Sequence, residues 1–137
     1  MFFPIQSSSR SQMIDITPKI QETIDAAGIT DGMVMVFSPH TTAAVTINEN
    51  ADPSVPVDIE TILDRMIPWK ANYRHMEGNS AAHAKSSLVG ASELVAIENG
   101  QLILGTWQSV FFCEFDGPRK RKVQFKFLPN VKVEQAK

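Results

Sequence analysis

Apolar residues recur at helical spacing in parts of the first two-thirds of the chain and at strand spacing in the last third. Over residues 17–27, apolar side chains repeat every three to four positions, Pro18 suits a first helical turn, and Gly28 suits a left-handed end. This pattern predicts a helix. Bulky and β-branched residues predict strands over residues 33–38 and 42–47.

A second helix is predicted over about residues 56–66. Its apolar residues are spaced i, i+3, i+4 and i+7, which is typical of one buried helix face. The face consists of Ile59, Ile62, Leu63 and Met66. Pro68 ends this helix, residues 69–78 are expected to form a loop, and a short helix is predicted over residues 79–88.

The last third of the chain contains only strand patterns. Strands over 94–97 and 101–104 meet at the Asn-Gly pair of residues 99–100, which is a strong hairpin signal. Strands massed at the end of the chain predict an α+β fold with a mixed or largely antiparallel sheet and two to three helices packed on it. A parallel nucleotide-binding sheet would need regular alternation of strands and helices and a glycine-rich first turn, and neither is present.

A second hairpin is predicted from strands over 106–115 and 120–128, joined by the turn at 116–118. The later strand alternates apolar and polar residues, so one face should be buried and the other wet. The earlier strand places apolar groups on both faces, in Val110, Phe111, Phe112, Cys113 and Phe115. Such a strand either lies centrally beneath a helical layer or contacts another subunit. Cys113 is expected to act as a small buried hydrophobe.

The length of 137 residues predicts one compact domain over residues 1–137, with a core over about 14–128 and short polar ends at 1–12 and 129–137. A net charge of −2 argues against a nucleic-acid partner, and the short apolar runs argue against a membrane span. The run of basic residues at 119–122 is interpreted as a solvated hairpin arm. One cysteine excludes a disulfide framework, and we expect a cytoplasmic protein.

The chain has three histidines, and each lies beside polar, small or turn-forming residues. They are His40, His75 and His83. Three imidazoles from two loops or helix starts can hold one divalent ion and leave a coordination position open, as catalytic zinc sites do. The alternative interpretation is three unrelated histidines, because the spacing of His75 and His83 does not place both on one face of a single helix.

Acidic and hydroxyl side chains lie near these histidines in the sequence. Glu49 or Glu77 can orient a ligating imidazole or serve as a general base, while capping and turn formation are the alternative roles. A helix start at residues 78–80 can bind a small anion. Further donors for an anion are available from Thr41, Thr42 and Arg74.

Three segments together resemble the YjbQ-like family, also called secondary thiamine-phosphate synthases. They are SPHTTAAVTINENAD (38–52), YRHMEGNSAAHAKSSLVG (73–90) and NGQLILGTWQSVFFCEFDGPR (99–119). Their order and spacing match the family over about residues 14–128, and all three histidines fit its pattern. Ser109 departs mildly from it, because the family often has glycine there.

The resemblance implies an α+β fold whose sheet curls into a barrel-like layer, assembled as a homotrimer. It implies a divalent metal, expected to be zinc, at His40, His75 and His83 in a pocket near a subunit interface. It also implies that several nearby residues surround the metal, namely Asn48, Glu49, Glu77, Asn79, Trp107 and Gln108. Of these, Glu49, Glu77 and Asn79 are our candidates for catalysis. Asn48, Trp107 and Gln108 join Thr41, Thr42 and Arg74 as candidates for substrate binding.

The activity implied by the resemblance is a weak thiamine phosphate synthase reaction, which joins a pyrimidine diphosphate to a thiazole phosphate with loss of pyrophosphate. That reaction would suit Mg²⁺, whereas three imidazoles suit zinc. A zinc-dependent hydrolase or lyase acting on a small phosphorylated or ester metabolite is therefore the alternative. A trimeric metal- or metabolite-binding protein without catalysis is the non-enzymatic possibility.

Overall fold

The chain forms two antiparallel β-sheets and three α-helices in a computed structural model that describes residues 1–131, 133 and 134. The elements are, in order, β1 (Phe2–Gln6), β2 (Gln12–Asp15), α1 (Thr17–Ala27), β3 (Gly32–Phe37), β4 (Ala43–Glu49), α2 (Ser54–Met66), α3 (Ser80–Val89), β5 (Ser92–Glu98), β6 (Gln101–Leu102), β7 (Gln108–Glu114) and β8 (Lys120–Pro129). Among the described residues, none of these helices is both long and apolar enough for a membrane span.

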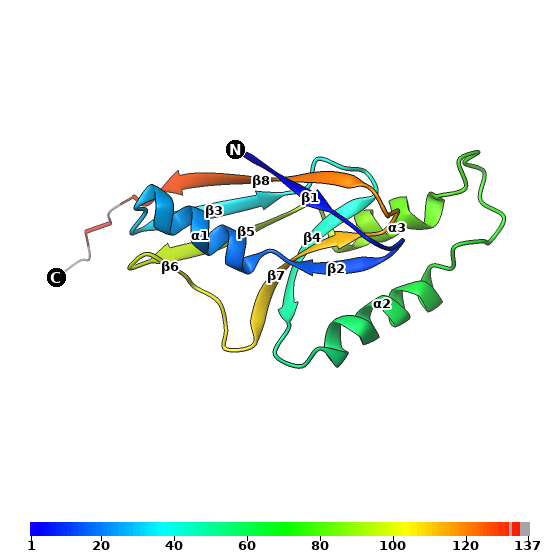
Figure 1. The fold of residues 1–137 in the computed structure, drawn as a ribbon, viewed down its shortest axis with the longest axis horizontal. Helices are drawn as coiled ribbons and strands as arrows, with labels where there is room; N and C mark the ends of the chain where they lie inside the picture. Colours follow the sequence, from blue (N-terminus) through cyan, green and yellow to red (C-terminus); the bar gives the residue numbers. More distant parts are fainter. Residues whose placement is uncertain (132, 135–137) are drawn as a thin grey trace.

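The predicted α+β class is confirmed, and every strand pairing found in the described residues is antiparallel. A five-stranded sheet, which we call sheet A, has the order β1-β8-β3-β5-β6, and a three-stranded sheet B has the order β2-β7-β4. Together they curl into a half-barrel. Figure 1 shows α1 near the C-terminal end of β8, whereas α2 and α3 lie toward the other end of the molecule.

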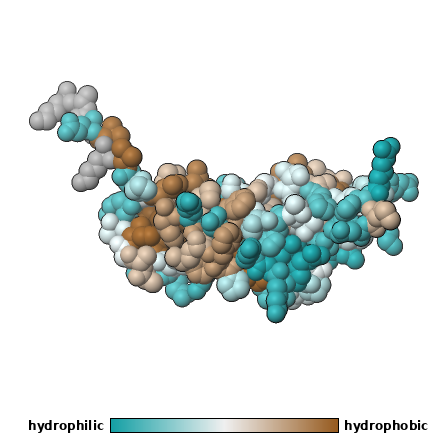
Figure 2. Space-filling model, turned by 90° about the horizontal axis from the view of Figure 1, so that it is seen from above, coloured by the Kyte–Doolittle hydropathy of each residue, from teal (hydrophilic) through white to brown (hydrophobic). Residues whose placement is uncertain are grey.

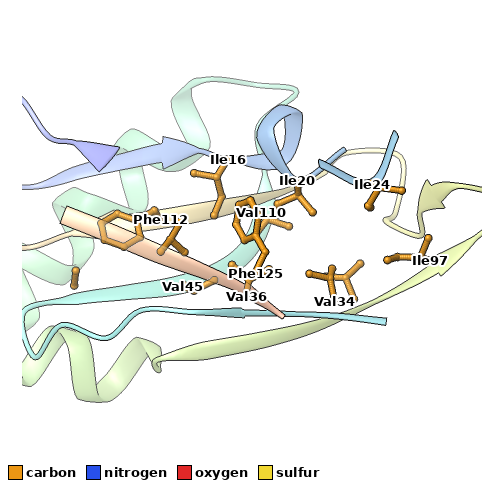
Figure 3. Close-up of a cluster of buried hydrophobic side chains, with 13 residues drawn as sticks. Ile16, Ile20, Ile24, Val34, Val36, Val45, Ile97, Val110, Phe112 and Phe125 are labelled. Carbon is orange, nitrogen blue, oxygen red and sulfur yellow. The ribbon is translucent and has the colours of Figure 1, made fainter. Parts of the chain in front are cut away.

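The main core lies between the two sheets and beneath α1. Ile20 and Ile24 of α1 pack against inward-facing residues of both sheets, as Figure 3 shows. A second cluster lies on the other face of sheet B and contains Ala44, Ala82, Phe111, Cys113 and Phe115. Strand β7 separates the two clusters, so both of its faces are buried within one chain. This confirms the central-strand alternative for residues 110–115.

The hairpin predicted from residues 106–115 and 120–128 is wrong. β7 pairs with β2 and β4 in sheet B, whereas β8 pairs with β1 and β3 in sheet A. The turn at residues 116–118 therefore carries the chain from one sheet to the other. The physical reason is burial. β7 has apolar residues on both faces and lies in the centre of sheet B, whereas β8 has only one apolar face and lies in sheet A with its other face exposed. The alternation predicted for β8 is confirmed, with Val123 and Phe125 buried and Lys122 and Lys126 exposed.

The prediction of a polar fringe at residues 1–12 is also wrong. Residues 2–6 form β1 on the edge of sheet A, and β2 begins at Gln12 on the edge of sheet B. Phe3 packs on Phe125, with ring centroids 4.7 Å apart. At the other end, β8 extends to Pro129, and part of the predicted fringe at 129–137 lies outside the described residues, namely 132 and 135–137.

Helix α2 differs from its prediction in packing. Each of its thirteen residues keeps some exposure, and Ile62 and Met66 of the expected buried face are 52% and 63% exposed. Ile59 and Leu63 are only partly buried. The helix therefore covers the outer face of sheet B incompletely, because its apolar stripe is wider than the contact that sheet B offers.

Local turn chemistry agrees with the sequence. Gly28 ends α1 at a φ of 66°, which is the left-handed conformation predicted for it. The hairpin between β5 and β6 turns at Asn99 and Gly100, with φ values of 50° and 75°. The predicted loop over 69–78 and the short helix after it are both present.

A buried ion pair joins the two sheets. Glu114 ends β7 and Arg121 lies near the start of β8, and the Arg121 Nε donates to Glu114 Oε1 over 2.9 Å. Ser7, just beyond β1, donates from Oγ to the same carboxylate over 2.6 Å. Arg121 also donates to Thr42 Oγ1 over 2.7 Å. Interpreting residues 119–122 as a solvated arm is therefore wrong for Arg121, whose position in β8 points inward like Val123.

These contacts set the ionisation of Glu114. Burial alone would raise the pKa of this carboxyl group, but the hydrogen bonds from Arg121 and Ser7 outweigh burial and hold its pKa below the ordinary value of 4.5. The folded state therefore binds a proton less readily than the unfolded chain does. The contribution of Glu114 to stability is present above the unfolded pKa and is lost as pH falls through the folded pKa.

Replacing Glu114 with Gln should lower the free energy of unfolding by about 3–5 kcal/mol at pH 7, because it leaves the Arg121 guanidinium buried without its counter-ion. Urea unfolding measures this. The matched control is Glu22→Gln, which removes an exposed i,i+3 partner of Lys19 and should cost about 1 kcal/mol or less. The difference between wild type and Glu114→Gln should narrow at acidic pH. Equal effects of the two substitutions would contradict this account.

Candidate metal and ligand site

The structure brings the three histidines to one open pocket of about 400 Å³. His40 lies in the loop between β3 and β4, His75 in the loop between α2 and α3, and His83 in α3. The rings of His75 and His83 are nearly perpendicular, with centroids 5.4 Å apart. Four further predicted site residues line the same pocket, namely Thr41, Thr42, Glu77 and Asn79.

The loop that carries His40 is held by hydrogen bonds at both of its ends. The Ser38 hydroxyl accepts from the backbone N–H of His40 over 3.4 Å and donates to the carbonyl of Ala43 over 3.2 Å. Thr42 is buried and accepts from the Arg121 guanidinium. The buried ion pair therefore fixes the loop from below, so the position of His40 depends on the junction between the two sheets.

The His40 ring contacts the backbone of the neighbouring strand. Its Nε2 lies 3.0 Å from the N–H nitrogen of Lys122 and 3.1 Å from the carbonyl oxygen of the same residue. Burial, followed by the positive charge of Arg121, holds the pKa of His40 below its ordinary value of 6.5. The neutral imidazole is the form that ligates metals, and Nδ1 is the ring nitrogen left for another partner.

Asn79 is one of the residues that line the pocket. It precedes α3, is only 7% exposed, and donates from Nδ2 to Asp116 Oδ2 over 2.8 Å. That contact orients the amide, and its Oδ1 is buried with no hydrogen-bond partner in the described part of the chain. A buried acceptor without a partner is costly unless a ligand supplies a donor or a cation. The pocket thus combines imidazole nitrogens with one unsatisfied amide oxygen.

The histidines and acids of the described residues are not arranged closely enough to enclose a metal ion. Within residues 1–131, 133 and 134, no three histidine, cysteine, aspartate or glutamate side chains lie close enough to hold a metal together. His75 and Glu77 are exposed on the loop before α3, whereas His40 and His83 are partly buried. The donor types suit a divalent ion such as zinc, and His75 is the candidate ligand on the least buried segment.

Three charged residues that were not predicted as site residues also line the pocket. They are Asp116, Arg119 and Arg121. Arg119 pairs with Asp116 over 3.0 Å between Nη2 and Oδ2, and Arg121 pairs with the buried Glu114. The alternation of residues in β8 could have identified Arg121, because it places residue 121 on the same inward face as Val123. Asp116 and Arg119 reach the pocket because the chain crosses from sheet B to sheet A between β7 and β8. The predicted hairpin does not contain this crossing.

Four predicted site residues lie away from this pocket, namely Asn48, Glu49, Trp107 and Gln108. Asn48 and Glu49 end β4, and Glu49 pairs in register with Gln108 at the start of β7, next to Trp107. A seven-residue strand spans roughly 20 Å, so this group lies at the opposite end of β4 from His40. Trp107 is 65% exposed. We call these four residues the far cluster.

The remaining candidates differ in exposure. Thr41 is exposed at the mouth of the pocket, whereas Thr42 is buried beneath it. Arg74 is exposed on the loop that carries His75, but it is not among the residues that line the pocket. Among the anion donors predicted from the sequence, the two threonines are therefore at the site and Arg74 is beside it.

A second depression of about 510 Å³ adjoins the first and shares His40, Thr41 and His83 with it. Its other walls are small residues of α3 and the segment after it, including Ser86 and Ala91. The first depression is lined with charged groups and the second is not. The two depressions therefore differ in charge although they meet at the same two histidines.

The chain matches the family described as "UPF0047 protein YjbQ-like" over residues 2–130. It is 53% identical over 125 residues to the UPF0047 protein YugU of Bacillus subtilis, a match that covers 90% of this chain and 95% of that protein. A UPF0047 protein of Methanocaldococcus jannaschii is 49% identical over 126 residues, covering 92% of this chain and 91% of the relative.

Two solved structures share the fold. An uncharacterised protein of the YjbQ/UPF0047 family from Clostridium acetobutylicum has a TM-score of 0.91 at 52% identity, covering 93% of this chain and 99% of its own. A hypothetical protein from Aeropyrum pernix has a TM-score of 0.90 at 34% identity, covering 95% and 98%. The architecture is therefore kept at much lower sequence identity.

The environment of His40 predicts a titration midpoint below 6.5, because burial and the Arg121 charge disfavour the imidazolium ion. Imidazole NMR signals followed against pH on metal-free protein measure the midpoint. The same chain unfolded in urea supplies the control and should titrate at the ordinary value. A His40 midpoint at or above 6.5 in the folded protein would show that the ring is solvated or paired with an acid.

Proposed function

The chain belongs to the YjbQ-like UPF0047 family, and we propose that His40, His75 and His83 hold one divalent metal ion for chemistry on a small phosphorylated metabolite. The observation that supports this most directly is the pairing of His75 and His83 in the pocket that also contains His40. The unsatisfied Asn79 oxygen in the same pocket agrees with a bound cation or a ligand donor. Zinc is the ion that suits imidazole ligands best, with Mg²⁺ second if the reaction releases pyrophosphate.

We propose separate roles for the residues that line the pocket. When bound, the ion supplies Lewis-acid polarisation of a substrate oxygen. Thr41 and the Arg119 guanidinium lie at the mouth of the pocket, where they can orient a phosphate group. Glu77 is exposed on the pocket wall and is our candidate for moving a proton. Asn79, fixed by Asp116, would orient the ligand from the pocket floor.

Two reactions suit this set of groups. The first is the thiamine phosphate synthase reaction implied by the resemblance, which needs cations to stabilise departing pyrophosphate. Arg119 and Arg121 are available, but each is already paired with a carboxylate, which reduces its attraction for a second anion. That observation favours the second reaction, zinc-dependent hydrolysis or elimination on a small phosphorylated or ester metabolite. A metal-binding protein without catalysis would contain the same ligands but show no turnover.

We also propose that the chain assembles as a homotrimer through the outer face of sheet A. Met33 of β3 is in register with Leu128 and Ala96, and Met35 lies between Leu94 and Lys126, so the apolar residues form a surface that Lys126 borders. Leu94 is 56% exposed. Figure 2 shows apolar surface gathered over the half of the molecule that carries the C-terminal end. A large exposed apolar sheet face is typical of a protein contact.

Assembly would also give the far cluster a role. β3 ends at Phe37, and only Ser38 and Pro39 separate that residue from His40, so the outer face of sheet A runs up to the histidine pocket. Since Glu49 and Trp107 lie at the opposite end of β4, we propose that the far cluster of one subunit approaches the histidine pocket of another. Cys113 is buried and free, which agrees with the cytoplasmic location that we propose.

Replacing His83 with Ala should lower the bound metal by at least tenfold, because the pocket loses the partner of His75. Mass spectrometry of metals after dialysis against zinc measures the content. The control is Ser87→Ala, one turn further along α3, whose hydroxyl donates to the His83 carbonyl. Wild-type protein and Ser87→Ala should each hold about one ion per subunit. Equal stoichiometry in His83→Ala, or metal-free wild type, would contradict the proposed site.

Leu94→Lys should shift the mass measured by light scattering from an assembly toward the 15.2 kDa of one chain, because it places a charge in the centre of the proposed contact. The control is Ile62→Lys, an equally exposed apolar residue on α2, which should leave the assembly intact. If Ile62→Lys dissociates the protein and Leu94→Lys does not, the contact lies on α2 and the proposed face is wrong.

A further inference from the structure

A separate pocket of about 230 Å³ lies between α2 and the outer face of sheet B. It shares no residue with either depression at the histidines, and Asn48 of the far cluster is part of its lining. Residues of α2, α3 and all three strands of sheet B line it, and most of them are apolar. The apolar lining includes Met13, Ile59, Leu63, Val89, Cys113 and Phe115.

The pocket exists because α2 does not close onto the sheet beneath it. Ile59 and Leu63 are only partly buried, although they face the pocket. Asp64 of α2 is held to α3 by an ion pair with the buried Lys85. The helix thus contacts both α3 and strand β2, and a space remains between it and the sheet over Cys113 and Phe115. Burial, followed by the negative charge of Glu60, raises the pKa of the Cys113 thiol to about 12. The thiol is therefore protonated near neutral pH and is a poor nucleophile.

Glu60 is the acidic residue that lines this apolar pocket. Its Oε1 is buried and has no hydrogen-bond partner in the described residues. Burial, followed by the nearby charge of Asp64, raises the pKa of Glu60 above its ordinary value, against smaller opposing effects of the Met13 backbone and Lys85. The nearby cation, Lys85, bonds Asp64 instead. The pocket therefore contains a carboxyl group that lacks a cationic partner.

We propose that this pocket binds a small amphipathic cation, with an ammonium group on the Glu60 carboxylate and an apolar body against Leu63 and Phe115. An ammonium ion satisfies the buried oxygen and restores the charge balance of an acid in apolar surroundings. At the ~30 Å³ occupied by a liquid water molecule, the space accepts roughly eight non-hydrogen atoms. The class of ligand is thus a monocyclic or short-chain primary amine, distinct from the phosphorylated metabolite proposed for the histidines.

Three probes of the same shape separate charge from fit, namely benzylamine, benzyl alcohol and benzoate. Calorimetric titration of the full chain in EDTA keeps the amine from ligating metal at the histidines. We expect saturable binding of benzylamine, about tenfold weaker binding of benzyl alcohol, and the weakest binding for benzoate. Benzoate binding equal to that of benzylamine, or no saturable binding of any probe, would overturn the proposal.

Variants then locate the interaction. Glu60→Gln should remove the advantage of benzylamine over benzyl alcohol, whereas Asp58→Asn, an exposed acid on the same helix outside the pocket, should keep it. Leu63→Trp should fill the space and abolish binding of all three probes, with circular dichroism to check the fold. Ile59→Trp tests the same point if Leu63→Trp does not fold. Unchanged amine binding in Glu60→Gln, or in a folded pocket-filling variant, would place the cation elsewhere.

Discussion

The buried pair of Glu114 and Arg121 is the interaction on which the rest of this structure depends. It lies where the chain leaves one sheet and enters the other, and neither side chain has appreciable exposure. Because the loop after β1 and the loop before β4 both bond to this pair through Ser7 and Thr42, four segments meet at one charge centre. Two buried charges are tolerated only when their hydrogen bonds are satisfied, so this junction permits few other arrangements of the four segments.

The histidine pocket is built on that junction. Thr42 and His40 share a loop, and the next acid along the chain, Asp116, holds Asn79 at the start of α3. Each cation at the pocket, Arg119 and Arg121, is matched by a carboxylate, and burial lowers the pKa of His40, which favours the neutral imidazole. The pocket therefore presents neutral nitrogen and oxygen donors over a balanced set of charges. These donors agree with our proposal that the pocket binds a metal ion and, through that ion, an anionic ligand.

Local chemistry was readable from the sequence, whereas the contacts between sheets were not. Gly28 and the Asn99-Gly100 turn act within a few residues of themselves, so their conformations follow from residue type. The turn after β7 contains the turn-forming residues Asp116, Gly117 and Pro118. These residues predict a reversal of the chain, but they do not determine whether the two flanking strands pair with each other. The strand β1 was missed because its edge position leaves it half exposed, with Phe3 and Ile5 as the inward residues.

The same distinction applies to the site. His40, His75 and His83 were selected by residue type and by a family resemblance, and their common pocket depends on the sheet crossing. A hairpin of β7 and β8, as the sequence predicts, does not place Arg119 and Asp116 at this pocket. The separation of Glu49 from the histidines follows from the antiparallel register of β4 and β7, which sequence spacing alone does not reveal.

The most direct test of a shared metal site is anomalous X-ray scattering at the zinc edge from crystals grown with zinc. The account predicts one peak per subunit, within coordination distance of nitrogen atoms from His40, His75 and His83. A peak at another position, or a zinc-soaked crystal with no peak in this pocket, would contradict it.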